Sequence, residues 1–315
     1  MSRFAPSRPW DSTASDPNDE TFGDVVERVT VPDLETGVDA DVVVVGEPFD
    51  AAVIGRHGAA KGPGGIRNAL AGVKTHSFDA GPVVDGTVLG DLGNVDVSSI
   101  DTASIQRRVR AVTADVHAAD TLPVFLGGDN SLTVANAGPL LDRGRVGVVN
   151  FDAHLDVREV RETPTSGTPY RQLLEEGLDA YVCVGVRHHE TSTVYADYLD
   201  EQGGEIVTAE TVGRDLEGAL EDATAAVADV EHLYVSVDCD VLDATAAPGV
   251  SAPTPGGLTT RELFELVRRV AADDRVAGFE VVECAPPLDD DNRTSAAAAR
   301  TVAHFLAGYG GGADG

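Results

Sequence analysis

Short apolar runs alternate with amphipathic segments along most of the chain. Eight runs of three to six residues consist mainly of Val, Leu and other apolar types. Such runs are typical of strands that are buried on both faces of a parallel sheet. Between most of them, apolar residues recur every three or four positions, which predicts helices. The predicted strands cover residues 41–45, 87–92, 122–126, 146–151, 181–184, 205–207, 233–237 and 279–282.

Helix-start signals support this alternation of strands and helices. Asp101 precedes one amphipathic segment as an N-cap residue, and Thr259 with Glu262 forms a capping box before another. Strands that alternate with helices predict one doubly wound α/β domain. We therefore expect a three-layer α/β/α sandwich with a mainly parallel sheet of about eight strands.

The two ends of the chain lack the alternation. Residues 1–38 are rich in Pro, Ser, Asp and Glu, which predicts an extended N-terminal arm with one short helix near residues 22–29. Residues 308–315 are rich in glycine and predict a flexible tail. No repeat or linker divides residues 39–307, so we expect a single domain there.

Composition narrows the classes of partner. The 315 residues include 23 Lys and Arg against 53 Asp and Glu, a formal charge of −30. This charge disfavours binding to nucleic acid or anionic membranes. A disordered chain could carry this charge but would not contain 42% hydrophobic residues. A folded protein from a halophilic host accounts for both features, because concentrated salt screens the repulsion between the acidic side chains.

Two negative findings predict a cytoplasmic protein. The three cysteines show no paired framework or metal-binding spacing, as in a reducing compartment. No segment resembles a signal peptide, and no apolar run approaches the 18 residues or so of a membrane span.

Polar residues occupy alternate positions directly after the apolar run at residues 146–151. They are Asp152, His154 and Asp156. If the backbone stays extended, these side chains point the same way. Without a cation, clustered carboxylates repel one another and raise each other's pKa. A solvated strand end is the simpler alternative, but a site for a divalent metal accounts better for the pattern.

Two further polar clusters follow predicted strands. Asp238 and Asp240 repeat the alternate spacing, and Asp129-Asn130 follows the strand at residues 122–126. Ligands in such sheets bind beyond the carboxyl ends of the strands. Each cluster alone could be a turn or a helix cap. Together they offer oxygen-rich ligands suited to two Mn²⁺-like ions, which would lower the pKa of a shared water and make it a nucleophile.

Several segments resemble, in order, the motifs of the ureohydrolase family, which includes arginase, agmatinase and formimidoylglutamase. The resemblance runs from about residue 55 to residue 305, through residues 127–131 (Gly-Gly-Asp-Asn-Ser), 152–156 (Asp-Ala-His-Leu-Asp), 165–167 (Thr-Ser-Gly), 236–243, 248–253 and 283–286. It implies an arginase-like fold, two Mn²⁺ ions per subunit, and a trimer or hexamer. The implied reaction is hydrolysis of a linear C–N bond in a guanidino or formimino group by a hydroxide held between the metals.

The resemblance also implies roles for individual residues. One manganese would be held by Asn130, Asp152, Asp156 and Asp238, and the other by Asp152, His154, Asp238 and Asp240. Asp156 would pass a proton to the leaving amine, and Glu283 would pair with the amidinium of the substrate. A carboxylate facing a planar N–C–N cation makes charge-assisted hydrogen bonds, which agrees with this role. The alternative for Glu283 is an ordinary salt bridge at a strand end.

Two departures from the family pattern bear on the substrate. Asn130 stands where most members have His, and an amide oxygen is a weaker ligand than imidazole, so we expect looser binding of that manganese. The loop after Gly167 reads Thr168-Pro169-Tyr170, where arginases place a His. Both features resemble the formimidoylglutamase branch of the family.

A substrate with two carboxylates needs cationic contacts. Arg158 has the same strand parity as the three ligands before it and is our first candidate; Arg187 and Ser166 are further candidates. The alternative is that Arg158 only balances nearby acidic residues. We expect hydrolysis of N-formimidoyl-L-glutamate to L-glutamate and formamide, a step of histidine degradation. Agmatinase or another guanidino-acid hydrolase that releases urea is the alternative, followed by a non-catalytic metal-binding relative.

Overall fold

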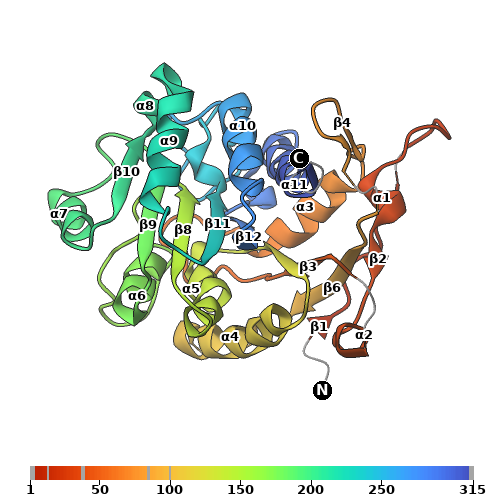
Figure 1. The fold of residues 1–315 in the computed structure, drawn as a ribbon, viewed down its shortest axis with the longest axis horizontal. Coiled ribbons are helices and arrows are strands. Elements are labelled where there is room, and N and C mark those ends of the chain that lie inside the picture. The colour runs from red at the N-terminus through yellow and green to blue at the C-terminus, as the bar shows by residue number, and fades with distance from the viewer. Residues whose placement is uncertain (1–3, 13, 37–39, 84–85, 99–100, 312–315) are drawn as a thin grey trace.

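The apolar runs form a central sheet that crosses the whole molecule (Figure 1). The computed structural model describes residues 4–12, 14–36, 40–83, 86–98 and 101–311. Eight parallel strands lie in the order β6-β3-β7-β12-β11-β8-β9-β10. Their bounds are β3 Val42–Gly46, β6 Leu89–Val95, β7 Leu122–Leu126, β8 Val146–Phe151, β9 Ala180–Val186, β10 Glu205–Thr208, β11 His232–Asp238 and β12 Val276–Val282. The predicted parallel sheet is confirmed.

Helices cover both faces of the sheet, which gives three layers (Figure 1). In β3, Val42 and Val44 pack into one core while Val43 and Val45 pack into the other. This alternation explains why the strands are apolar throughout. The first core lies under α3 Gly62–Leu70, α8 Ala209–Arg214, α9 Leu216–Ala226, α10 Thr260–Ala271 and α11 Arg293–Gly311. The second lies under α4 Thr102–Ala118, α5 Thr133–Ala137, α6 Pro169–Glu176 and α7 Thr193–Glu201.

The N-terminal arm packs on the edge of the sheet. It forms two strands that pair with β6, and its helix near residue 22 ends at Val25 rather than Val29. Buried Asp91 accepts hydrogen bonds from Ser7 Oγ and Trp10 Nε1, both at 2.7 Å, which ties the arm down. The elements of the arm are β1 Phe4–Ala5, α1 Phe22–Val25, β2 Glu27–Arg28 and α2 Val31–Thr36.

The remaining elements are short. A two-stranded hairpin joins β4 His76–Ser77 and β5 Gly81–Pro82, and single 3₁₀ turns cover Ala59–Lys61, Asn130–Leu132, Gly138–Asp142, Cys239–Val241 and Pro286–Leu288. At the C-terminus, α11 continues to Gly311, beyond the expected start of the tail at residue 308. A Cβ on Gly308 would lie 2.0 Å from the carbonyl oxygen of Arg268, so glycine allows α11 to pack closely against α10. Residues 312–315 of the expected tail lie outside the described residues.

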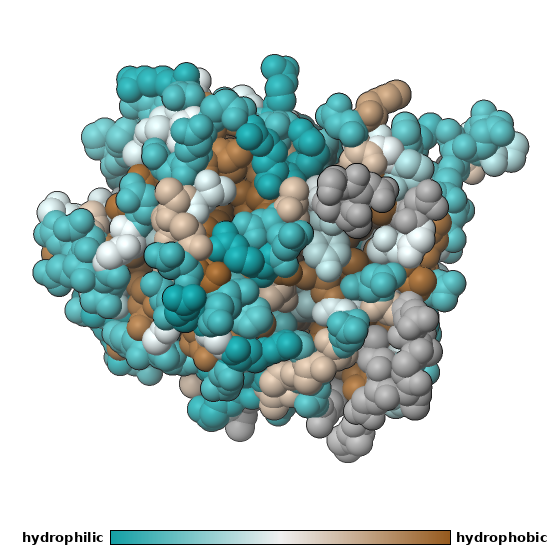
Figure 2. Space-filling model, in the orientation of Figure 1, coloured by the Kyte–Doolittle hydropathy of each residue, from teal (hydrophilic) through white to brown (hydrophobic). Residues whose placement is uncertain are grey.

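The surface reflects the acidic composition. Figure 2 shows that hydrophilic residues cover most of one face, with hydrophobic residues visible mainly in the hollows between them. Cys183, Cys239 and Cys284 are buried and unpaired. In the part of the chain that the structure describes, no helix is long and apolar enough to cross a membrane.

Candidate metal centre

Four neighbouring strands bring the predicted polar clusters to one edge of the sheet. β7, β12, β11 and β8 lie side by side and run parallel. Asn130 follows β7, Glu283 follows β12, Asp238 and Asp240 lie at the end of β11, and Asp152, His154 and Asp156 follow β8. Residues more than 100 positions apart in sequence therefore meet at the carboxyl ends of the strands.

The side chains at this edge form two groups with metal-ligating geometry. In each group, one ligand atom per residue lies within 4.8 Å of the others. The first group is Asp152, His154 and Asp240, and the second is Asp152, Asp156 and Asp238. Asp152 belongs to both groups, as expected for a carboxylate that two cations share.

The backbone that produces this arrangement differs from our expectation. β8 ends at Phe151, and Asp156 has a φ of 48°, in the left-handed region. Asp238 ends β11, and its Oδ1 accepts a hydrogen bond of 2.8 Å from the Asp240 amide in a 3₁₀ turn. The side chains thus converge through tight turns rather than through the extended alternation that we assumed. Glu283 also lies in the left-handed region, with a φ of 60°. Backbone strain of this kind, about 1–3 kcal/mol per residue, is common at functional sites.

The carboxyl groups of the site are buried and repel one another. Burial, followed by the charge of Asp152, raises the pKa of Asp156 well above its usual value. Burial and the charge of Asp240 do the same to Asp238. Burial also raises the pKa of Asp152. A divalent cation among these groups would remove the repulsion and favour the charged forms.

The imidazole of His154 is held from both sides. Its Nδ1 lies 3.2 Å from Asp240 Oδ2 and 3.5 Å from Asp152 Oδ1, while its Nε2 lies 2.9 Å from Glu190 Oε2. Burial disfavours the imidazolium, but Asp240, Asp152 and Glu190 together raise the pKa of His154. Nδ1 therefore faces the carboxylates, at the place where a metal ion would bind, and Glu190 fixes the plane of the ring.

Glu190 is itself held by Arg187. Arg187 Nε donates to Glu190 Oε1 at 2.8 Å, and Arg187 Nη1 donates to the Asp240 carbonyl at 2.6 Å. Although burial would raise the pKa of Glu190, hydrogen bonds from His154 and Arg187 lower it to about 2. Glu190 is therefore a carboxylate at neutral pH. This geometry does not support Arg187 as a direct substrate contact, because its donors serve Glu190 and Asp240.

Asn130 and Glu283 lie close together across two strands. The backbone N–H of Asn130 donates to Glu283 Oε1 at 3.1 Å, and the backbone N–H of Glu283 donates to the Gly128 carbonyl at 2.8 Å. Asn130 Nδ2 is hydrogen-bonded to Asp156 Oδ2. Glu283 Oε2 is buried without a hydrogen-bond partner, and burial followed by the charge of Asp129 raises the pKa of Glu283. A buried carboxylate oxygen that lacks a donor is suited to a cationic ligand.

A cavity of about 190 Å³ opens beside the two groups. His154, Asp156, Glu190, Arg158 and Tyr195 contribute to its wall. Arg158 is exposed, and its guanidinium lies 5.9 Å from the centre of the Tyr195 ring. The strand does not continue to Arg158 as we assumed, but the residue still reaches the cavity.

Ser166 does not line this cavity. Its Oγ accepts a hydrogen bond of 3.2 Å from the Ile54 amide, and its own amide donates to the Ala52 carbonyl at 2.9 Å. Ser166 therefore joins two loops, and its predicted contact with the substrate stays a prediction.

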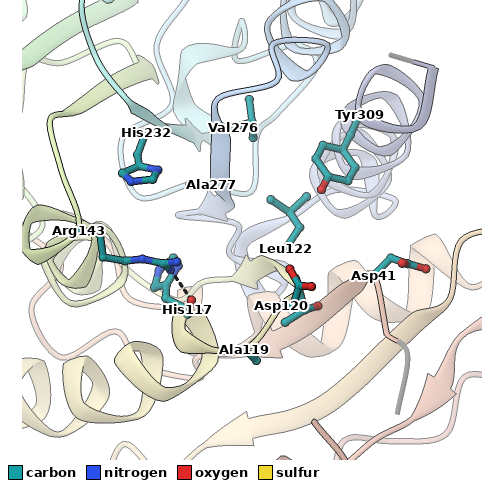
Figure 3. A pocket seen from close by; sticks show the side chains of 11 residues that line it. Asp41, His117, Ala119, Asp120, Leu122, Arg143, His232, Val276, Ala277 and Tyr309 are labelled. Atoms are coloured by element: carbon teal, nitrogen blue, oxygen red, sulfur yellow. Dashed lines mark hydrogen bonds between the residues drawn. The ribbon is translucent and has the colours of Figure 1, made fainter. Parts of the chain in front are cut away.

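A second polar cavity lies at the opposite edge of the sheet, where β3, β7, β11 and β12 begin (Figure 3). Its volume is about 330 Å³. Arg143 donates to the backbone carbonyl of His117 there, and among the described residues that line the cavity, Asp41 and Asp120 carry the carboxylates (Figure 3). Burial lowers the pKa of His117 to about 4. This cavity therefore lacks the cluster of carboxylates found at the carboxyl edge.

The residues at the carboxyl edge fit divalent metal ions. The donor set consists of carboxylate oxygens, one imidazole nitrogen and one amide side chain, which suits Mn²⁺ better than a structural zinc. Asp240 Oδ1 is buried without a partner, as is Glu283 Oε2. Without a bound cation, these two oxygens would have no partner and the carboxyl groups would repel one another, and both effects cost free energy.

Some residues of the site were missed by sequence analysis. Glu190 lies more than 30 positions after His154, on the loop after β9, and no motif links it to the site, whereas Arg187 on the same loop was expected as a substrate contact and not as the partner of Glu190. Thr133 and Glu280 lie behind Asn130, and both are fully buried. The sequence held one signal that could have pointed to them, namely that Glu280 is a polar residue within the apolar strand β12.

Comparisons with known proteins agree with this geometry. Residues 40–308 match the model of the arginase family. The chain is 57% identical to the formimidoylglutamase of Halobacterium salinarum over 309 residues, which cover 97% of this chain and 99% of that protein. The crystal structure of formimidoylglutamase from Bacillus subtilis superposes with a TM-score of 0.88 and 31% identity, over 95% of this chain and 94% of that one. Formiminoglutamase from Trypanosoma cruzi, solved with Mn²⁺, gives a TM-score of 0.80 and 27% identity, over 90% and 98%.

Proposed function

Because the chain belongs to the arginase family, we propose that its carboxylate cluster binds two Mn²⁺ ions and hydrolyses N-formimidoyl-L-glutamate to L-glutamate and formamide. The observation that supports this most strongly is the meeting of two ligand groups that share Asp152 beside one cavity. The similar proteins from Halobacterium salinarum and Bacillus subtilis are formimidoylglutamases, and hydrolysis of an amidine C–N bond is the reaction of this chain as well. The reaction is a step of histidine degradation.

The proposed metal ligands divide into two overlapping sets. Asp152, His154, Asp238 and Asp240 would hold one ion, and Asn130, Asp152, Asp156 and Asp238 would hold the other. Divalent ions at such a site lower the pKa of bound water, so that hydroxide is available near neutral pH. Support for manganese comes from the oxygen-rich donor set and from the Mn²⁺ in the Trypanosoma cruzi structure.

Glu283 and Asp156 would act on the formimino group. Glu283 Oε2, which has no hydrogen-bond partner among the described residues, would accept hydrogen bonds from the planar N–C–N cation and orient its carbon for attack. Asp156 would take up the proton released from the attacking water and deliver it to the departing amine of glutamate.

Arg158 would bind a carboxylate of the substrate. It lines the cavity two residues after Asp156, and its guanidinium lies 5.9 Å from the centre of the Tyr195 ring. A cation there favours a substrate with carboxylates over decarboxylated agmatine. Arg187 would act through Glu190 as a positioning residue, and Ser166 would fix the loop that carries Gly167.

Turnover with a panel of substrates tests the proposal. Mn²⁺-loaded protein in concentrated salt is assayed with formimidoylglutamate, agmatine, arginine and guanidinobutyrate. We expect formamide and glutamate in equal amounts from the first substrate and no urea from the others. Urea from a guanidino substrate, without formamide from formimidoylglutamate, would overturn the proposed substrate, and bound metal without any turnover would indicate a non-catalytic relative.

The family resemblance also suggests an oligomer of three or six subunits. Light scattering of the purified protein in concentrated salt tests this, with a mass of about three or six times the 32.7 kDa of one chain expected. A mass of one chain would contradict it.

A further inference from the structure

A buried network of polar side chains lies directly behind Asn130. Glu280, fully buried in the middle of the sheet, accepts hydrogen bonds at Oε1 from Thr133 Oγ1 at 2.6 Å and from Ser236 Oγ at 2.7 Å. At Oε2 it accepts from Tyr234 at 2.8 Å and from Asn136 Nδ2 at 2.9 Å. Four donors converge on one carboxylate, which is the arrangement expected for a buried charge.

Thr133 connects this network to the metal centre. Its Oγ1 lies 2.6 Å from Glu280 Oε1 and also 2.6 Å from Asn130 Oδ1. A threonine hydroxyl has one proton, and both of these oxygens are acceptors, so Thr133 can donate to only one of them. Burial raises the pKa of Glu280, but its four hydrogen bonds act in the opposite direction and favour the carboxylate, which is a stronger acceptor than a neutral amide oxygen. The short contact between Thr133 Oγ1 and Asn130 Oδ1 then has no proton with which to form a hydrogen bond.

The two ends of a carboxamide have nearly the same shape, so hydrogen-bond partners decide which end faces which neighbour. If Asn130 Nδ2 faces Thr133, it donates to Oγ1, and Oγ1 donates to Glu280. One N–H of Asn130 Nδ2 and the hydroxyl of Thr133 then each have an acceptor. Asn130 Oδ1 is left facing Asp156 Oδ2, and two oxygens in this position are stabilised by a cation that both of them bind.

We propose that Thr133 and Glu280 are positioning residues, which turn the side-chain oxygen of Asn130 towards the metal. Glu280 fixes the direction of the Thr133 hydroxyl, and the hydroxyl oxygen then accepts only from Asn130 Nδ2. The inference rests on the proposed function in one respect, namely that Asn130 is a metal ligand. It explains how an amide, whose ends look alike, serves as a ligand with a defined orientation.

Metal binding without substrate tests the inference. Metal-free protein in concentrated salt is titrated with Mn²⁺ by calorimetry, for the wild type and for T133V, T133S and N130A. Thr133→Val removes the hydroxyl and should weaken one of the two Mn²⁺ sites by about 10–100-fold, leaving the other unchanged. Thr133→Ser keeps the hydroxyl and should bind like the wild type.

Two controls separate this role from a merely structural one. Thr301 is equally buried, in α11, and donates only to the Ala297 carbonyl at 3.0 Å, so Thr301→Val should leave both Mn²⁺ affinities unchanged. In the N130A background, Thr133→Val should weaken Mn²⁺ binding no further, because its effect passes through Asn130. Thermal unfolding of each metal-free variant shows that it folds, and Thr133→Ala replaces Thr133→Val if the latter does not.

The outcomes are distinct from those of the substrate assay. Wild-type Mn²⁺ affinities in T133V, or an equal weakening by Thr133→Val with and without Asn130, would overturn the inference while leaving formamide release untouched. Conversely, a protein that releases no formamide but shows the expected pattern of Mn²⁺ binding would refute the proposed function and leave the inference standing.

Discussion

The two ligand groups of the proposed metal centre have Asp152 in common, and the proposed ligand sets also share Asp238, but the two groups are supported differently. In the half that contains His154 and Asp240, the imidazole is fixed between carboxylates on one side and Glu190 on the other, at 2.9 Å. In the half that contains Asn130 and Asp156, the proposed ligands are a neutral amide and a carboxyl group on a strained backbone. We call these the His154 half and the Asn130 half.

The difference shows how support outside the ligand shell decides the strength of a metal site. In the His154 half, Arg187 holds Glu190 and Glu190 holds the ring, so the ligand nitrogen points at the metal position before any metal binds. In the Asn130 half, the support is the buried hydrogen-bonded chain through Thr133. An amide oxygen also donates less charge to a metal than imidazole or carboxylate. We therefore expect the His154 half to bind Mn²⁺ more tightly.

Removing a carboxylate that both halves share should have the largest effect. Asp238→Asn should release both ions and lower kcat/KM by at least about 10³-fold, because metal ions supply several kcal/mol of transition-state stabilisation. Metal analysis and turnover of formimidoylglutamate check this. Asp273→Asn, which removes a carboxylate paired with Arg275 outside the site, should change neither quantity. Loss of only one ion from D238N would show that Asp238 serves one half.

Glu190→Gln should affect the His154 half alone. It removes the charge that fixes the imidazole, so Mn²⁺ affinity at one site should fall by about 10–100-fold while the other site is unchanged. Calorimetric titration resolves the two sites. The matched control is Glu210→Gln, because Glu210 pairs with exposed His188 at 3.1 Å, away from the centre. Equal weakening of both sites would contradict the separate support of the two halves.

Arg158→Ala should change substrate binding without changing either metal site. A charge-assisted hydrogen bond from an exposed side chain is worth about 1.5 kcal/mol, so KM for formimidoylglutamate should rise about tenfold with kcat little changed. Arg161→Ala removes a nearby exposed cation and serves as the control. An unchanged KM in R158A would indicate that Arg158 only balances acidic residues.

The Mn²⁺ affinity of both halves should increase gradually with pH. The pKa values of Asp156, Asp238 and His154 are raised, the carboxyl groups chiefly by burial and His154 by its acidic neighbours against the effect of burial. Below their raised pKa values these groups hold protons, which Mn²⁺ must displace. Affinity should therefore rise with pH, by up to about tenfold per unit for each proton released, and level off above these pKa values. Affinity that falls as pH rises from 6 to 8 would contradict this account.

Much of the fold follows from the sequence, because strands buried on both faces need apolar residues at every position. All eight runs, including the short one at residues 205–207, became parallel strands. The strands β1 and β2 could not be predicted, since each has two residues and depends on an edge of β6 far away in the sequence. The helical end of the chain at residues 308–311 was missed because glycine has low helix propensity, and tertiary packing on α10 overrides it.

The metal cluster was predicted for a reason that was partly mistaken. The alternate spacing of Asp152, His154 and Asp156 suggested an extended strand, whereas a left-handed turn at Asp156 brings the groups together. Positions at the carboxyl ends of neighbouring strands were the more reliable signal. Partners such as Glu190 could not be inferred, because contacts between loops of different strands depend on the folded geometry.

Titration of the metal-free protein with Mn²⁺ tests the difference between the halves most directly. We predict two ions per subunit with different affinities, and Asn130→His should tighten the weaker site while leaving the tighter one unchanged. Two equal affinities in the wild type, or a change at the tighter site in N130H, would contradict the account.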